Sequence, residues 1–241
     1  MLPVKIDFHI HTYRSYDSLM KPEKILKTAK KRGLDAIVVC DHDTIQGALE
    51  VKAANKDQNF TVIVGAEIKT NAGDITGIFL LKEIKSREVG EVIREIREQN
   101  GKVILNHPFK GHDLEKIDIS KVDFIEAYNA RLTEEENKKA VELAMKYNKQ
   151  VVAGSDAHLY GEVGNAYTVF DNFNSFIPLR HHYIPSKHIY KTISQYIKSF
   201  KERNFRIFFS ATAIQLKHSG KIALGGLKKF FRFLNNSKTA A

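Results

Sequence analysis

The sequence predicts an α/β protein built on a mostly parallel β-sheet, and three observations indicate this fold class. Short, strongly apolar runs alternate with segments of helical apolar spacing over roughly the first 170 residues. Apolar strands of this kind are typical of parallel sheets that helices cover. Each helical segment is flanked by residues that favour the start or the end of a helix. Seven such strands form either a barrel or a large open sheet with its helices outside.

The elements follow one another in a regular order along the chain. The expected strands are Val4–Ile10, Ala36–Cys40, Thr61–Glu67, Ile75–Leu81, Lys102–Asn106, Val122–Tyr128 and Gln150–Ser155. The expected helices are Pro22–Arg32, Thr44–Ala54, Ser86–Gln99 and Glu134–Tyr147. Pro22 suits a first helical turn, and Gly33 and Gly101 suit C-terminal stops. Thr133 followed by Glu136 has the pattern of a capping box. About seven residues separate the third strand from the fourth, too few for a crossover helix, so the regular alternation breaks there.

Composition excludes several classes of protein. The 241 residues are 43% hydrophobic, which is too apolar for a wholly disordered chain. A single cysteine, Cys40, excludes a disulfide framework and a thiolate cluster within the chain, and favours a reducing compartment. No apolar run reaches the roughly 18 residues that span a bilayer, and the N-terminus enters an expected strand without a signal peptide. We therefore expect a soluble cytoplasmic protein.

The net charge of +10 is unevenly distributed. From Pro178 to the end the chain has 13 Lys and Arg residues against one acidic residue, whereas residues 1–177 have 25 basic and 27 acidic ones. We therefore expect a slightly acidic domain over residues 1–177 and a basic, mainly helical extension over residues 178–241. An apolar face recurs at helical spacing in this extension, formed by Ile189, Ile193, Ile197 and Phe200. Three uses fit the extension: packing on the domain, binding nucleic acid, and contact with an anionic membrane.

Histidine and acidic residues concentrate near the ends of the expected strands. They are His9, His11, Asp17, Asp41, His42, Asp43, Glu67, Asp74, His107, Asp156 and His158. Because the carboxyl ends of parallel strands meet on one face, we expect these distant residues to lie together. Imidazole and carboxylate without sulfur suit zinc, manganese or iron, and these residues outnumber the four ligands of one tetrahedral ion. The sequence thus predicts two or three divalent ions that share a carboxylate, polarise a phosphoryl or carbonyl oxygen and activate water.

Each of these residues also has an explanation that needs no metal. The run from Asp41 to Asp43 suits the cap of the helix near Thr44. Asp74 suits a turn, and His107 suits a packed loop. The remaining histidines have no place at a strand end and are expected on the surface or in the core: His112, His181, His182, His188 and His218. The coincidence at the same end of five strands favours the metal site.

Six short motifs make the sequence resemble a known family. They are Asp-Phe-His-Ile-His-Thr at 7–12, Ser-Tyr-Asp-Ser at 15–18, Asp-His-Asp-Thr at 41–44, Gly-Ala-Glu at 65–67, Asn-His-Pro-Phe at 106–109 and Gly-Ser-Asp-Ala-His at 154–158. In combination, from about residue 4 to 170, they resemble the polymerase and histidinol phosphatase (PHP) family. The resemblance implies a distorted seven-stranded (β/α) barrel with a two- or three-metal centre that hydrolyses phosphate esters.

The resemblance also implies which residues hold each ion. One ion would have the ligands His9, His11, Glu67 and Asp156, a second would share Glu67 and add His107, and a third would have Asp17, His42 and His158. Asp74 stands where many relatives have a histidine, and a carboxylate can still bind a metal there. Around the sixth strand another metal-binding histidine of some relatives is absent, and Glu126, Asn129 and Arg131 stand there instead.

Three residues are candidates for contact with substrate. A guanidinium beside a metal cluster can bind a phosphate through two hydrogen bonds, which makes Arg131 the first candidate. Its alternative role is an exposed charge at the start of the helix that follows Thr133. Lys110 and Asn129 are the other candidates.

These residues favour a metal-dependent phosphoesterase. A hydroxide held by the metal would attack phosphorus, and Asp156 would take up the proton of the water as the catalytic residue. The expected substrate is a small phosphomonoester, a nucleotide or an oligonucleotide end, so phosphatase and nuclease activities are both open. Two alternatives are an amidohydrolase acting on C–N bonds and a binding protein that uses its basic tail. The absence of a lysine at the end of the fourth strand argues against the first, and the nearly complete ligand set argues against the second.

Overall fold

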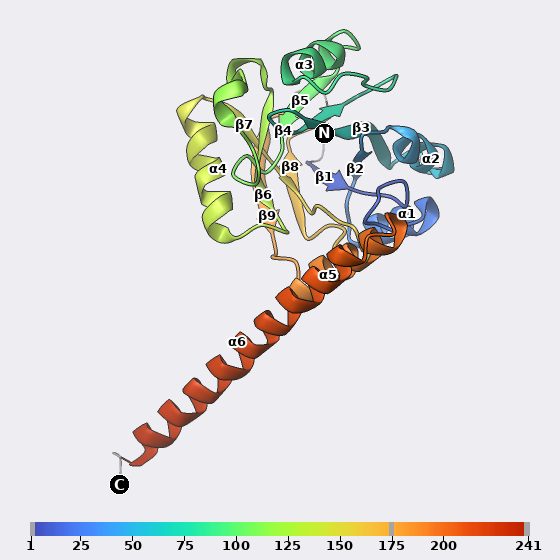
Figure 1. Cartoon of the computed structure of the whole chain (residues 1–241). Coiled ribbons are helices and arrows are strands. Elements are labelled where there is room, and N and C mark those ends of the chain that lie inside the picture. The colour runs from blue at the N-terminus through green and yellow to red at the C-terminus, as the bar shows by residue number, and fades with distance from the viewer. Residues whose placement is uncertain (1–2, 174–175, 239–241) are drawn as a thin grey trace.

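Nine strands form a single sheet in the computed structural model, which describes residues 3–173 and 176–238. The strands are β1 (Val4–Ile10), β2 (Ala36–His42), β3 (Thr61–Thr70), β4 (Gly73–Ile78), β5 (Lys102–Leu105), β6 (Phe124–Asn129), β7 (Gln150–Gly154), β8 (Ala166–Phe170) and β9 (Pro178–Tyr183). The α-helices are α1 (Pro22–Lys31), α2 (Gln46–Ala54), α3 (Val89–Arg97), α4 (Glu134–Lys146), α5 (His188–Lys201) and α6 (Phe205–Lys238). Figure 1 shows α1 to α4 around the sheet and α6 extending away from it.

The sheet curls into a nearly closed barrel. Its strand order is β7-β6-β5-β4-β3-β2-β1-β8-β9, and the segment after β7 returns to the end of β1. There the amide of His11 donates to the Ala157 carbonyl at 2.9 Å, and the amide of Ala157 donates to the His9 carbonyl at 3.1 Å. The α/β class and the barrel-like sheet that the sequence predicts are therefore confirmed.

The structure has nine strands where the sequence predicts seven. All the predicted strands occur, but β8 pairs antiparallel with β1, and β9 pairs antiparallel with β8. Antiparallel pairs are consequently as numerous as parallel ones, so the sheet is mixed rather than mostly parallel. The sequence of β9, Pro-Leu-Arg-His-His-Tyr, lacks a strand's apolar pattern because β9 is an edge strand with partly exposed side chains.

The predicted break in the alternation between the third and fourth strands is a hairpin. Strands β3 and β4 pair antiparallel, with Glu67 opposite Thr76 and Lys69 opposite Asp74. Because β4 runs in the reverse direction, its first residues lie at the rim where β3 ends. This reversal brings Asp74, the second residue of β4, to the same rim as Glu67.

A bulge in β1 decides which way its histidines face. The pairing of β1 with β2 shifts register between Asp7 and Ile10. Before the shift Ile6 and Phe8 pack inside the barrel, whereas Ile10 packs in the core between sheet and helices. An extra residue in a strand reverses the alternation of its side chains. His9 and His11 can therefore face the rim directly above Phe8.

The barrel interior is filled by side chains and leaves no room for a channel at its centre. Phe8 is the middle of this packing, with its ring centroid 5.6 Å from that of Phe170 and 6.3 Å from that of Phe124. A second and larger core lies between the sheet and α1 to α4. Burying apolar surface on both sides of the sheet stabilises the strands and holds their ends in place.

The predicted extension is partly built into the domain. Its first strand, β9, belongs to the sheet, so the predicted boundary between residues 177 and 178 falls between two paired strands. The apolar face that contains Ile193 lies on α5, and the chain from Phe205 to Lys238 forms one further helix, α6. The ring of His218 on α6 stacks on His188 of α5, with centroids 3.9 Å apart. Contact of α6 with nucleic acid or a membrane stays a prediction, and no helix among the described residues is long and apolar enough to cross a bilayer.

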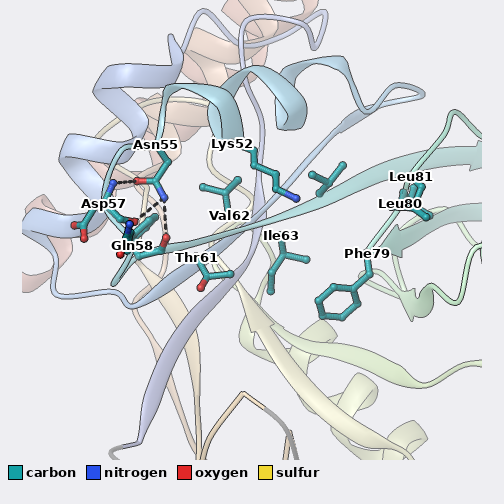
Figure 2. Close-up of a pocket in the computed structure, with 12 residues that line it drawn as sticks. Lys52, Asn55, Asp57, Gln58, Thr61, Val62, Ile63, Phe79, Leu80 and Leu81 are labelled. Atoms are coloured by element: carbon teal, nitrogen blue, oxygen red, sulfur yellow. Dashed lines mark hydrogen bonds between the residues drawn. The ribbon is translucent and has the colours of Figure 1, made fainter.

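A surface pocket lies at the start of β3, at the opposite end of that strand from Glu67 (Figure 2). It is lined by the end of α2, the start of β3 and the segment after β4, with Lys52, Asn55, Phe79 and Leu81 among its residues. In barrels of this kind the end where strands begin serves mainly stability, and the chemistry lies at the other end. We therefore build the site from the rim that carries Glu67.

Truncation after Ile177 should destabilise the domain, because it removes β9 and leaves the backbone of β8 unpaired at the edge of the sheet. We expect an aggregating product, or a melting temperature lower by roughly 10 °C. Truncation after Lys221 keeps β9 and α5 and should leave the melting temperature unchanged. Soluble yield and differential scanning fluorimetry check both, and a fully stable protein ending at Ile177 would contradict the assignment of β9 to the domain.

Candidate metal centre

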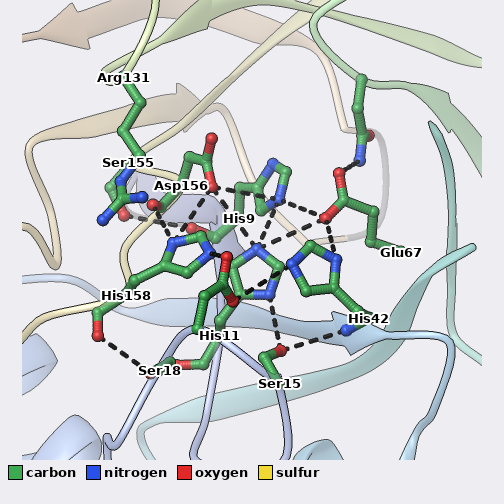
Figure 3. A network of polar contacts seen from close by, with 12 residues as sticks. His9, His11, Ser15, Ser18, His42, Glu67, Arg131, Ser155, Asp156 and His158 are labelled. Carbon is green, nitrogen blue, oxygen red and sulfur yellow. Dashed lines mark hydrogen bonds and ion pairs between the residues drawn. The ribbon is translucent and has the colours of Figure 1, made fainter. Parts of the chain in front are cut away.

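The residues that the sequence singles out as ligands converge at one end of the barrel. Three overlapping groups have ligand atoms within 4.8 Å of one another: His9, His11 and Glu67; His11, His42 and His158; Glu67, Asp74 and His107. Asp17 Oδ2 lies 3.0 Å from His158 Nε2, and Asp156 Oδ1 lies 3.5 Å from His11 Nε2. Figure 3 shows many of these side chains pointing toward one another from separate strands and loops. Every residue proposed as a metal ligand is therefore in one cluster.

Glu67 lies at the centre of the cluster. Its Oε2 is 3.0 Å from His42 Nδ1. The same oxygen is 3.5 Å from Nε2 of His9 and 3.6 Å from Nε2 of His11. Its Oε1 is 3.0 Å from Nε2 of His107. The two oxygens of one carboxylate thus face different imidazoles, which is the arrangement that a ligand shared by two ions requires.

Hydrogen bonds at the outer ring nitrogens determine how the histidines face the cluster. Nδ1 of His9 lies 2.9 Å from Glu126 Oε1, and Nδ1 of His158 lies 2.8 Å from the carbonyl oxygen of Asp156. Both partners are acceptors, so Nδ1 donates and Nε2 of each ring is directed into the cluster. An outer partner that fixes the tautomer in this way is typical of histidines that bind metals.

His11 is held in the same way through a short relay. The Ser15 hydroxyl donates to Asp41 Oδ1 at 2.6 Å and therefore accepts from Nδ1 of His11 at 3.0 Å. Asp41 also accepts from the amide of Thr12 at 2.6 Å. Asp41 thus supports a ligand and orders the loop after β1, whereas the N-cap of α2 is Ile45 with no side-chain cap. The alternative role of Asp41 as a helix cap is not what the structure shows.

Asp74 is supported by a histidine that the sequence did not place in the site. The amide of Asp74 donates to Nε2 of His112 at 2.9 Å. The ring of His112 also packs edge-on against His107, with centroids 5.6 Å apart. His112 therefore supports the backbone on one side of the cluster, because the loop that carries it folds back over β4.

The backbone is constrained where two ligands leave their strands. His107 has φ 25° and Asp156 has φ 51°, both in the left-handed region that residues other than glycine rarely adopt. Such conformations cluster at functional sites, where the surrounding structure holds them. Just before Asp156, a Cβ atom at Gly154 would lie 2.3 Å from Glu126 Oε1 and 2.5 Å from His9 Cβ. Only glycine lets β7 approach the His9–Glu126 pair this closely.

Neighbouring carboxylates raise the pKa of two histidines in the cluster. Burial alone would lower both values, because it disfavours the charged form. The negative charges of Glu126 and Glu67 outweigh burial at His9 and hold the pKa of its imidazole well above the usual value. Against the same opposing effect of burial, Asp17 and Glu67 raise the pKa of His42 to about 10. Without metal these imidazoles are therefore protonated at neutral pH.

Other members of the cluster shift in the opposite direction. Burial lowers the pKa of His11 well below its usual value, and the neighbouring His158 and His42 lower it further. Burial would raise the pKa of the Asp156 carboxyl, but His9, His11 and His158 outweigh burial and hold it well below its usual value. The cluster thus contains ionised carboxylates next to the neutral imidazole of His11, whereas His9 and His42 must lose a proton before a divalent ion can bind them.

Unpartnered polar atoms show that the donor set fits a metal. Among the described residues, the buried atoms without a hydrogen-bond partner are Asp17 Oδ1, His42 Nε2 and His107 Nδ1. The first two lie 3.4 Å apart. Leaving a polar atom buried and unpaired costs about 1–3 kcal/mol. A divalent ion bound by Asp17 and His42 would remove this cost, and nitrogen with carboxylate oxygen suits zinc, manganese and iron.

Arg131 is buried in an ion pair. Its Nε and Nη2 donate to the two carboxylate oxygens of Glu162 at 2.9 and 2.7 Å, and its Nη1 donates to Ser194 Oγ at 3.0 Å. The guanidinium edge that could grip a phosphate therefore grips Glu162. The alternative role of Arg131 as an exposed charge is wrong, because its side chain is only 8% exposed. Phosphate binding by Arg131 stays a prediction that would require this ion pair to open.

The other two substrate candidates differ from each other. Asn129 is buried, and its amide nitrogen donates to Glu126 Oε2 at 2.9 Å and to Asp156 Oδ2 at 3.3 Å. It therefore orients two carboxylates of the site. Lys110 is exposed in the loop after β5, where its charge is close enough to oppose protonation of His107. Substrate contact by Asn129 or Lys110 stays a prediction, and Lys110 has the free side chain.

Three buried acids, Asp7, Glu126 and Glu162, have supporting roles that sequence reasoning did not assign. Glu126 could have been found, because it interrupts the apolar run of β6. Asp7 is fully buried and accepts from the amides of Ser155 and Gly164, both at 2.9 Å. Glu162 lies in a loop whose sequence gives no indication of burial. These acids tie the segment after β7 to β1 and to the start of β8.

Comparisons with known proteins agree with this geometry. Residues 134–177 match the family model described as PHP-associated. Two uncharacterized proteins of Methanocaldococcus jannaschii are 36% and 34% identical over 143 and 183 residues, which cover 52% and 71% of this chain and 84% and 72% of theirs. A 5'-3' exoribonuclease of Haemophilus influenzae is 37% identical over 67 residues, which are 28% of this chain and 24% of that enzyme.

A solved structure shows the same fold. It is a two-domain protein from Bacteroides vulgatus that contains a predicted PHP-like metal-dependent phosphoesterase. The TM-score is 0.59 and the identity is 21%, over 70% of this chain and 59% of that one. The match thus spans a little over half of that two-domain chain.

Glu126→Gln should weaken metal binding without unfolding the protein. The amide keeps the shape but removes the negative charge that holds Nδ1–H of His9, and loss of such a partner costs roughly 10–100-fold in metal affinity. Isothermal titration of the chelator-treated protein with Mn²⁺ measures the change. Glu134→Gln at the exposed start of α4 is the matched control. Equal affinities for both variants would contradict the role of Glu126.

Metal affinity should fall as the pH falls. The pKa of His9 is raised well above its usual value and that of His42 to about 10, so both rings carry protons at neutral pH in the metal-free protein and a metal ion must displace them. Between pH 8 and pH 6 we expect about a tenfold loss of affinity per pH unit for each proton displaced. Titrations in buffers of different ionisation enthalpy count the released protons. Affinity that is constant over this range would show that neither ring is protonated.

Proposed function

The chain belongs to the polymerase and histidinol phosphatase (PHP) family, and from this premise we propose that it hydrolyses phosphate esters at its metal centre. The observation that carries the proposal is the cluster around Glu67, which joins three groups of possible ligands into one continuous site. A phosphate ester presents several anionic oxygens, so a site that gathers several cations is better suited to it than a site for a single ion. Bound there, divalent ions would neutralise phosphoryl oxygens and lower the pKa of water.

The protein's own side chains have distinct tasks in this proposal. Asp156 is ionised, and its Oδ1 faces the histidines while its Oδ2 accepts from Asn129. It can therefore take up the proton of an attacking water from a defined direction. Glu67 holds two parts of the cluster at a constant separation. His9, His11 and His158 keep Nδ1 occupied by an outer partner and present Nε2, where a metal ion would bind.

The proposed substrate is a small phosphomonoester, a nucleotide or an oligonucleotide end. Positive charge near the rim supports an anionic substrate. Lys110 is exposed there, and the half-buried Lys191 of α5 has its pKa lowered by burial and by the nearby charges of Lys110 and Arg131. The likeness to part of the Haemophilus influenzae exoribonuclease supports including nucleotides in the set.

His9→Ala and Asp156→Ala should each abolish hydrolysis while the fold persists. Both residues lie at strand ends, where side chains contribute to function more than to packing. We expect kcat/KM for phosphomonoesters to fall at least about a thousandfold, equivalent to roughly 4 kcal/mol of transition-state stabilisation. His182→Ala on the edge strand β9 is the control. Wild-type activity and metal content in either site variant would disprove the assignment of the cluster.

A substrate screen distinguishes the proposal from its rival. The Mn²⁺-loaded protein is assayed with phosphomonoesters, 5'- and 3'-phosphorylated oligonucleotides and cyclic amides. Turnover of phosphate esters alone supports the proposal. Turnover of cyclic amides without phosphate release would identify an amidohydrolase instead.

A further inference from the structure

One face of α5 contacts the metal centre at three points. Ser194, Lys198 and Lys201 are spaced by four and three residues, so they lie on the same side of the helix. Figure 1 shows that α5 lies against the barrel, whereas α6 leaves it. Lys198 and Lys201 contact the loop that follows β1, and Ser194 contacts Arg131.

Lys201 binds the loop that follows β1. Its Nζ donates to the carbonyl oxygens of Tyr13 and Ser15, both at 2.7 Å, and of Ser18 at 2.8 Å. An ammonium group has three donors, and all three are used on one short loop. The loop carries Asp17, the carboxylate next to His158. A single side chain of α5 thus closes the loop around the position of Asp17.

Lys198 acts on His42 through the aromatic ring of Tyr16. Its Nζ lies 4.3 Å from the ring centroid of Tyr16. The opposite partner of Tyr16 is His42, whose ring stacks on it with centroids 4.3 Å apart and 7° between the planes. A cation over one ring of a stacked pair holds that ring in place. Nδ1 of His42 contacts Glu67 Oε2 at 3.0 Å, and the stack on Tyr16 is a second contact that orients the ring.

Ser194 acts on His158 through the buried ion pair of Arg131 and Glu162. Its hydroxyl accepts from Nη1 of Arg131, and Nη2 of Arg131 donates to Glu162 Oε2 at 2.7 Å. The same oxygen of Glu162 accepts from the amide of His158 at 3.1 Å. Arg131 therefore connects α5 to the backbone of His158.

The three contacts end at Asp17, His42 and His158, and these three side chains already face one another. His158 Nε2 lies 3.0 Å from Asp17 Oδ2, and His42 Nε2 lies 3.4 Å from Asp17 Oδ1. The other ligands are held by the sheet itself, as His9 is by Glu126. We propose that α5 assembles this part of the centre, and that Lys201 is a positioning residue for an ion bound by Asp17, His42 and His158.

The proposal assigns a function to the start of the basic extension. It rests on the proposed function only in requiring that the cluster binds metal ions, and not on any particular substrate. His9 and Glu67 lie on β1 and β3, and Glu126 of β6 holds His9, so this part of the cluster is held by the sheet. Disturbing α5 should therefore remove one ion selectively and leave the others bound.

Lys201→Met in the full-length chain tests the proposal, because methionine keeps most of the volume and removes all three donors. Lys187→Met is the control, since it removes the same charge from an exposed lysine just before α5. Chelator-treated proteins are titrated with Mn²⁺, and the bound metal is counted by elemental analysis. We expect Lys201→Met to lose about one ion per chain, or to bind its weakest ion roughly 10–100-fold less tightly, with the remaining sites unchanged.

A second measurement requires no metal. Amide hydrogen exchange of the metal-free proteins should be faster in residues 13–18 of Lys201→Met and unchanged in Lys187→Met. Ser194→Ala, a smaller change on the same face, should weaken the same ion if Lys201→Met does not fold. Equal metal content, affinity and exchange in Lys201→Met and wild type would overturn the proposal, and so would an equal loss of every ion. A wild-type chain that binds no metal would instead overturn the proposed function.

Discussion

The carboxylate of Glu67, buried against imidazoles from three other segments, is the contact on which the rest of the structure depends. Placing ionised groups in a protein interior costs several kcal/mol for each ion unless charge and hydrogen bonds compensate. Compensation requires that His9, His42 and His107 arrive within about 3–4 Å of one carboxylate. The sheet must therefore hold its strand ends in a strict arrangement. The bulge in β1 and the reversal of β4 are the local irregularities that satisfy this requirement.

A layer of buried acids extends the same constraint outward. Glu126 holds His9, Asp41 holds His11 through Ser15, and Glu162 holds the backbone of His158. None of these acids is left unpaired, and each comes from a different part of the chain. The outer layer thus determines the tautomers and directions of the inner one, which is the usual relation between the ligands of a metal site and their supports. It also explains why the centre contains more acidic residues than ligands alone would require.

The position of the basic extension in the structure shows that its first part belongs to the domain. Its high positive charge first indicates a separate module, but β9 completes the sheet and α5 lies against the metal centre. The ammonium group of Lys201 binds carbonyl groups of the loop that carries Asp17. Only α6 extends away from the barrel, so a separate binding role concerns that helix. A charge difference between segments therefore does not by itself mark a domain boundary.

The sequence by itself determined the α/β class, the approximate positions of seven strands, and the set of His and acidic residues that meet at one end of the barrel. It could do so because strand ends and helix caps are local patterns, and because His and Asp at the ends of parallel strands meet by geometry alone. It could not show β9, since an edge strand such as Pro-Leu-Arg-His-His-Tyr needs no apolar pattern. Nor could it show that Arg131 is paired with Glu162 or that Lys201 holds the loop of Asp17. These contacts join residues 31 and at least 183 positions apart, and they form only when the closed barrel has brought the segments together.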